Sequence, residues 1–173
     1  MEIWFLSDTH FDHDNLIKHG ARKGFINSSE ADDCMADNIR KKVKQGDMVY
    51  FVGDFAMWHH DDIFQGYKFP GNWCILRGNH DKGWKAKAQY PTIKDIMIED
   101  QKITLCHYPM YSFNCSHWNA WQIYGHHHTD VSHIVTGKRM NVCVDLHNFS
   151  PVSWEQVKEY MKNRPDNWDL IKR

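Results

Sequence analysis

Three short, nearly continuous apolar runs dominate the first half of the hydrophobic pattern. They cover residues 3–7, 48–52 and 73–76. Runs of this length, apolar at almost every position, are typical of strands that are buried on both faces of a parallel sheet. We therefore expect three such strands.

A helical pattern separates the first two of these strands. Ser29 and Asp32 have the spacing of a capping box, and Gly46 is placed to end the helix. Apolar residues recur at every fourth position in between, namely Ala31, Met35, Ile39 and Val43. The order strand, helix, strand predicts a right-handed crossover between parallel strands.

The pattern changes in the second half of the chain. Two alternating segments flank Asp100 and Gln101 and predict a hairpin, and two more strands follow. The four expected strands cover residues 95–99, 102–106, 122–124 and 140–145. We expect them to form a second, mostly antiparallel sheet. Ser153 and Gln156 then form a capping box for a last helix.

Composition limits the class of protein. A chain of 173 residues is expected to form one domain over residues 1–173, in the α/β class. Its 21 basic and 22 acidic residues balance, which argues against strong binding of duplex nucleic acid. Five cysteines without a C-x-x-C pair favour a reducing compartment. With no signal segment and no membrane-spanning run, we predict a cytoplasmic protein without a membrane partner. Protein partners are not indicated.

Polar islands follow the apolar runs. They occupy residues 8–10, 53–54, 78–81 and 125–128, and His107 ends another predicted strand. Because ligand sites in α/β sheets lie beyond the carboxyl ends of strands, these islands are expected to meet. Their imidazole, carboxylate and amide groups suit manganese, iron, zinc or nickel better than calcium. The sequence therefore predicts a site for two metal ions.

The alternation of side chains along an extended segment, here called parity, selects the ligands within the islands. If residues 8–10 are extended, Asp8 and His10 point to one side and Thr9 to the other. In the same way His126 and His128 converge, while His127 points away. A glycine precedes the ligand in three islands, where a missing side chain allows close approach.

These motifs resemble a known family. Asp8-x-His10, Gly53-Asp54, Gly78-Asn79-His80-Asp81, His107 and Gly125-His126-x-His128 are similar, in order, to the five motifs of the calcineurin-like metallophosphoesterases. The likeness covers residues 8–128 and is greatest to the small bacterial and phage members. It implies two packed mixed β-sheets flanked by helices, with the active site on loops at the carboxyl ends of the strands.

The resemblance also implies a ligand set and a reaction. One ion would be held by Asp8, His10, Asp54 and His128. The other would be held by Asp54, Asn79, His107 and His126, with manganese as the first choice. A metal-bound hydroxide would attack the phosphorus of a small phosphoester or nucleotide. His80 would be the catalytic histidine that protonates the leaving oxygen, and Asp81 would support it or fix the turn.

The chain departs from the family after the Gly53-Asp54 pair. Many phosphatase members continue with Asp-Arg, whereas residues 55–58 here are Phe-Ala-Met-Trp. A bidentate arginine favours a dianionic monoester, so its absence favours a phosphodiester substrate. The histidine at position 80 is retained, which keeps monoester substrates possible. The candidates to replace the clamp include His13, Arg22 and His117. Residues 108–121 are aromatic and form either a lid or a packed loop.

Other interpretations of the same sequence remain. The domain could be a retired phosphoesterase that serves as an interaction module, although such a protein would be expected to lose ligands. A nuclease is a further alternative. Asp145 and His147 repeat the Asp-x-His spacing, but they lie beyond the last motif, and we interpret them as structural.

Overall fold

The first sheet carries the three parallel strands that the apolar runs predict. The computed structural model describes residues 1–84 and 90–171. The strand order is β3-β2-β1-β8, with β1 (Ile3–Leu6), β2 (Met48–Val52), β3 (Asn72–Leu76) and β8 (Val152–Ser153). The pairs β1–β2 and β2–β3 are parallel, and β8 joins β1 in the antiparallel sense.

The second sheet has the order β4-β5-β6-β7. Its strands are β4 (Ile93–Ile98), β5 (Gln101–Cys106), β6 (Trp121–Tyr124) and β7 (Arg139–Asn141). Only β4–β5 is antiparallel; β5–β6 and β6–β7 are parallel, so the expectation of a mostly antiparallel sheet was wrong. The reason is the length of the connections 107–120 and 125–138, which let the chain return to the same end of the sheet.

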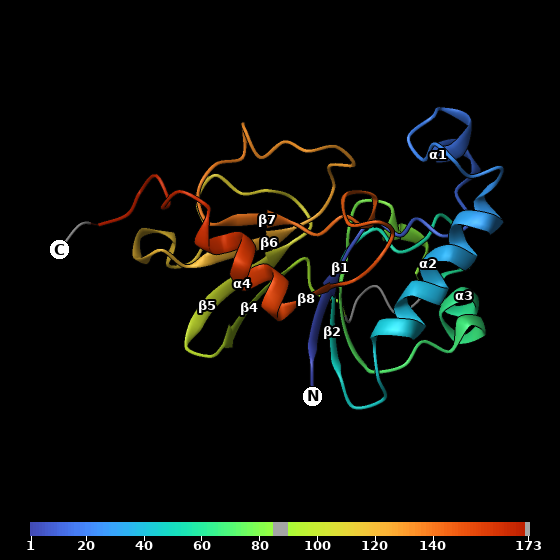
Figure 1. Cartoon of the computed structure of the whole chain (residues 1–173), viewed down its shortest axis with the longest axis horizontal. Helices are drawn as coiled ribbons and strands as arrows, with labels where there is room; N and C mark the ends of the chain where they lie inside the picture. Colours follow the sequence, from blue (N-terminus) through green and yellow to red (C-terminus); the bar gives the residue numbers. More distant parts are fainter. Residues whose placement is uncertain (85–89, 172–173) are drawn as a thin grey trace.

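Helices complete the sandwich. In Figure 1 the second sheet lies on one side of the first, and α2 (Ser28–Lys42) and α3 (His60–Tyr67) lie on the other. The final helix α4 (Trp154–Lys162) contacts β1, β7 and β8. The prediction of two mixed sheets flanked by helices is thus confirmed. No helix in the described part of the chain has the length and apolar character needed to cross a bilayer.

Alternation along the strands builds two apolar layers. Phe5 and Val52 belong to the core between the sheets, with residues of β5, β6 and α4. Leu6 and Phe51, one position away, belong to the core under α2. Both faces of the first sheet are therefore buried, which explains why its strands are apolar at nearly every position.

Some element ends differ from the prediction. Helix α2 is capped by Asn27, whose side chain accepts from the Glu30 N–H, and not by Ser29. It ends at Lys42, before Gly46. The capping box of Ser153 and Gln156 is present as predicted.

Two further differences arise where the chain turns. In the hairpin, Glu99 and Asp100 both have positive φ, so the turn lies one residue earlier than expected. After β7 the chain leaves the sheet, because the Val142 carbonyl accepts from Ser7 at the end of β1. It then enters a 3-10 turn, η3 (Val144–Leu146), in place of a longer strand. The other short helical elements are α1 (Asp14–Lys18), η1 (Asp81–Gly83) and η2 (Ser116–Trp118).

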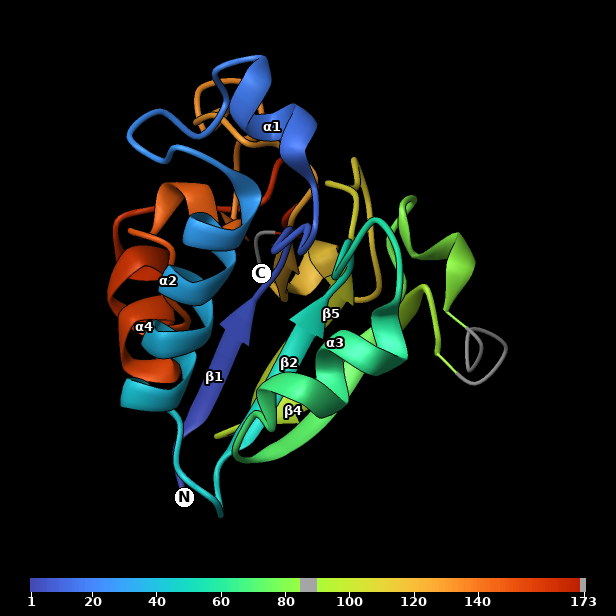
Figure 2. The same ribbon diagram turned by 90° about the vertical axis from the view of Figure 1, so that its right-hand side faces the viewer.

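The carboxyl ends of five strands face one region. In Figure 2 the arrows of β1 and β2 point toward the side where α1 lies. The segments that follow β1, β2, β3, β5 and β6 contain all five motifs.

Candidate metal centre

The segment after β1 has a strained backbone that the β2 loop supports. Asp8 and His10 have φ of 59° and 45°, in the left-handed region that side chains seldom adopt. Their N–H groups donate to the carbonyls of Gly53 and Asp54 at 3.0 and 3.1 Å. The segment is therefore not extended as the parity argument assumed, although Asp8 and His10 do face the same site.

Asp81 fixes the second strained loop. Asp54 has φ of 61°, and its N–H donates to the Asp81 carboxylate at 2.8 Å. The same carboxylate accepts from Phe55 at 2.8 Å and from Gly78 at 2.7 Å. It thus ties the loop after β2 to the loop after β3.

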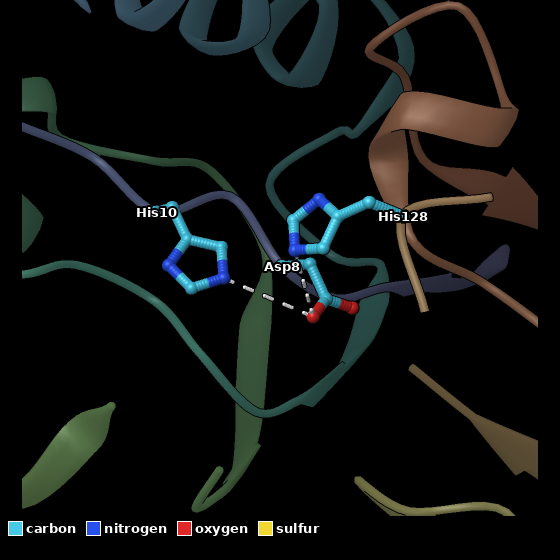
Figure 3. A group of neighbouring side chains, drawn as sticks. All are labelled: Asp8, His10 and His128. Atoms are coloured by element: carbon cyan, nitrogen blue, oxygen red, sulfur yellow. Dashed lines mark ion pairs between the residues drawn. The ribbon is translucent and has the colours of Figure 1, made fainter. Parts of the chain in front are cut away.

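One group of donors lies at the β1 side. Asp8 Oδ1 lies 4.0 Å from His10 Nε2 and 3.8 Å from His128 Nε2. Figure 3 shows the two imidazoles beside each other, each with a ring nitrogen directed at this carboxylate. The Asp8 carboxylate also accepts the His126 N–H at 3.0 Å, which holds the fifth motif against the first.

A second group of donors surrounds Asp54. Its Oδ2 lies 3.1 Å from His107 Nε2 and 3.5 Å from His10 Nε2. His107 Nε2 is also 3.1 Å from Asn79 Oδ1, while Nδ1 lies 2.9 Å from the Val52 carbonyl. Asp54 therefore contacts donors of both sets, as a bridging ligand would.

His126 lies at the edge of this arrangement. Its ring centroid is 5.3 Å from that of His107 and 4.7 Å from that of Tyr108. His127 follows it with its backbone bonded to Gly125 and Asn141. The left-handed backbone at His126, with φ of 72°, again replaces the extended geometry expected from parity.

Burial and charge shape the protonation of the donors. Burial lowers the pKa of His10 to about 2, so its imidazole is neutral at pH 7, the form that binds a metal. Burial raises the pKa of Asp8 to about 6. At Asp54 burial also raises the pKa, but the hydrogen bonds from His107 and the His80 N–H, together with the charges of His107 and His10, outweigh it and lower the pKa to about 2.

The donor chemistry fits metal ions. Two donors that each lie about 2.1 Å from one ion are separated by roughly 3 Å, close to the spacings found here. At His10, Nε2 is the ring nitrogen that faces the Asp8 and Asp54 carboxylates, and the buried Nδ1 has no hydrogen-bond partner among the described residues. Asp8, His10 and His128 form one candidate group, and Asp8, Asp54 and His107 form another.

Close approach explains the glycines of the motifs. A Cβ at Gly78 would lie 2.1 Å from Asp54 Oδ1, and one at Gly125 would lie 2.4 Å from Asp8 Oδ2. Each distance is far shorter than a non-bonded contact allows. A larger residue at either position would displace a carboxylate of the centre.

Comparisons with known proteins agree with this geometry. Residues 1–143 match the model of the calcineurin-like phosphoesterase superfamily domain. The chain belongs to this superfamily. An uncharacterized relative, MJ1445 of Methanocaldococcus jannaschii, is 31% identical over 90% of this chain and 89% of its own. The crystal structure of AQ665 from Aquifex aeolicus, a protein of unknown function, covers 92% of this chain and 98% of its own. It has a TM-score of 0.74 at 24% identity and so shares the fold.

Two of the other predicted site residues lie beside the donors. The exposed His80 follows Asn79, its N–H donates to Asp54 Oδ1 at 2.8 Å, and its ring lies 5.0 Å from that of His10. The ring of His13 lies 5.3 Å from that of His10 and 6.2 Å from that of His80. Both fit a position near a bound phosphate.

His117 lies elsewhere. It belongs to η2, which leads into the amino end of β6, whereas the fifth motif, residues 125–128, follows the carboxyl end of that strand. Its ring packs against Trp118, and its carbonyl accepts from Ile171. This placement disagrees with a substrate contact for His117 and with a lid formed by this part of the aromatic loop.

The Arg22 side chain also does not lie where a replacement for the phosphate clamp was expected. Its side chain is buried and donates to Asp145 and to the backbone of the first motif, so it does not extend toward a substrate. Asp145, interpreted as structural, contacts His128. Spacing in the sequence could not join Arg22 and Asp145, because 123 positions separate them.

Proposed function

We propose that this protein is a phosphoesterase that uses two divalent transition-metal ions, with manganese as the first choice. The observation that carries the proposal is the convergence of donor atoms around Asp8 and Asp54 at separations of 3.1 to 4.0 Å. One ion would be held by Asp8, His10, Asp54 and His128. The other would be held by Asp54, Asn79, His107 and His126.

Bound ions of this kind supply a water of lowered pKa and neutralise the charge of a phosphate. The remaining tasks fall to side chains. His80 is proposed to donate a proton to the leaving oxygen, since it adjoins ligand Asn79 and is exposed to solvent. His13 is proposed to bind a phosphate oxygen through Nδ1, which has no partner among the described residues. Asp81 is proposed to hold both loops in place.

A cavity beside the centre supports a small-molecule or nucleotide substrate. It has a volume of about 690 Å³ and is lined by Asn79, His107 and Tyr108, next to two cations, Arg77 and Lys82. Pockets of roughly 300–1,000 Å³ are typical of small ligands. We propose that the alcohol or nucleoside part of the ester binds here and that the cations favour anionic leaving groups.

The residues after Asp54 favour diesters. Phe55 and Ala56 are fully buried in the core under α2, so no arginine clamp extends from this segment. Without that clamp a dianionic terminus loses its bidentate partner. We therefore place phosphodiesters first and keep monoesters as the second substrate class.

The test uses two chromogenic esters. Apo protein prepared with a chelator is assayed on bis(p-nitrophenyl) phosphate and on p-nitrophenyl phosphate, with and without Mn²⁺. We expect turnover that requires metal and is faster on the diester. Asp54→Asn should remove most of the turnover. The control His127→Ala, between the proposed ligands His126 and His128, should change the turnover little.

Two outcomes would contradict the proposal. Metal-loaded wild-type protein that is inert on both esters and on a panel of nucleotides would favour an interaction module. Equal losses in Asp54→Asn and His127→Ala would show that the ligand assignment is wrong.

A further inference from the structure

A buried ion pair lies behind the metal centre. Asp145, in η3, accepts a hydrogen bond from His128 Nδ1 and another from Arg22 Nε at 2.8 Å. Arg22 Nη2 and Nη1 donate to the carbonyls of Asp8 at 2.7 Å and Thr9 at 2.8 Å. The side chains of Arg22 and Asp145 are 2% and 5% exposed.

The contacts of this pair are concentrated on the donors of one ion. Asp145 contacts the imidazole of His128, and Arg22 contacts the backbone that carries Asp8. The pair therefore connects the segment after β1 with the segment after β6. Because removing two charges from water costs about as much as their attraction returns, stability alone is a weak reason to bury such a pair.

The geometry gives the pair an orienting role. A hydrogen bond from His128 Nδ1 to Asp145 fixes the tautomer that leaves the Nε2 lone pair available, and Nε2 is the atom near Asp8. Arg22 donates twice to carbonyls beside Asp8, where φ is left-handed and the backbone needs support. Two of the proposed donors of one ion, Asp8 and His128, are thus held from behind.

We propose that Arg22 and Asp145 are positioning residues for the ion bound by Asp8, His10 and His128. They set the affinity for this ion and leave the ion at Asn79 and His107 largely unaffected. The inference rests on the metal centre of the proposed function, but it does not depend on phosphoester turnover.

The test measures metal binding by calorimetry. Apo wild-type protein and the variants Asp145→Asn, Arg22→Met and the double variant are titrated with Mn²⁺. For each single variant we expect one binding step to weaken about 10- to 100-fold, the range seen when partners of ligands are removed. The other step should stay within about threefold of wild type. The double variant should be no worse than the poorer single variant, because the two residues act as one unit.

Arg139→Met is the matched control. Arg139 is also buried, at 4% exposure, and its guanidinium donates to the carbonyls of Met110 and Tyr111, in a loop outside the donor groups. Its loss should lower the midpoint of thermal unfolding and leave both binding steps unchanged. A general loss of stability is thereby separated from a loss of positioning.

The outcomes separate the two proposals. Equal weakening of both steps, unchanged binding, or additive losses in the double variant would overturn the positioning role. If Arg22→Met fails to fold, Asp145→Asn still decides, because it keeps the shape of the side chain and removes the charge. Wild-type protein that binds two ions but cleaves no ester would refute the proposed function alone, and protein that binds no ion would refute both.

Discussion

Asp81 offers a large and calculable perturbation. Its carboxylate is fully buried and accepts three backbone N–H groups, from Asp54, Phe55 and Gly78. A buried donor left without a partner costs about 1–3 kcal/mol, so Asp81→Ala is expected to lose at least about 3 kcal/mol of unfolding free energy. For a domain with a total of about 5–15 kcal/mol, this is a severe loss.

Denaturant unfolding of the apo protein measures this loss. Asp81→Asn should fall between wild type and alanine, because one carbonyl oxygen remains as an acceptor. Asp95→Ala is the matched control, since the Asp95 carboxylate is more exposed and accepts from only two side chains among the described residues, Thr104 and Asn114. A change below about 1 kcal/mol for Asp81→Ala would refute the view that these three bonds hold the loops.

Three further predictions address the loops, acid stability and metal. Gly78→Ala should displace the Asp54 carboxylate and abolish Mn²⁺-dependent turnover, whereas Gly46→Ala, where nothing lies within 4 Å, should be active; an active Gly78→Ala would contradict the close approach. Hydrogen bonds, of which the one from the Glu2 N–H has the largest effect, lower the pKa of Asp47 below 3.8. Its carboxylate therefore stabilises the fold above about pH 4, and this contribution is lost as the pH falls through the lowered pKa. Acid titration of unfolding should be flatter for Asp47→Asn, and an unchanged profile would refute this. Chelation should lower the midpoint of thermal unfolding, and added Mn²⁺ should restore it. Free Mn²⁺ at 100 times Kd should raise the free energy of unfolding by about 2.7 kcal/mol for one site. A midpoint that does not move would argue against a bound ion.

The strands of the first sheet were predictable because both of their faces are buried. The apolar runs then mark the strand and the polar island marks its end, so residues 48–52 were predicted without error. In the second sheet the alternation was visible, but the direction of pairing was not. That direction depends on connections that local pattern does not describe.

That the motif residues would lie together was predictable from the sequence, and the backbone geometry that brings them together was not. The order of the motifs identified Asp8, His10 and Asp54, yet the parity argument assumed extended backbone where the structure has left-handed residues. Arg22 and Asp145 could not be joined by spacing, because their contact depends on how the segment after α1 lies against η3. Long-range ion pairs of this kind leave no periodic signal in a sequence.

The most direct test of the metal centre is anomalous diffraction from crystals soaked in Mn²⁺. We predict two anomalous peaks, roughly 3.5–4 Å apart, with the Asp54 carboxylate between them. His126 should ligate one ion and His128 the other. A single peak, or peaks away from Asp8 and Asp54, would contradict a centre of two metal ions at these residues.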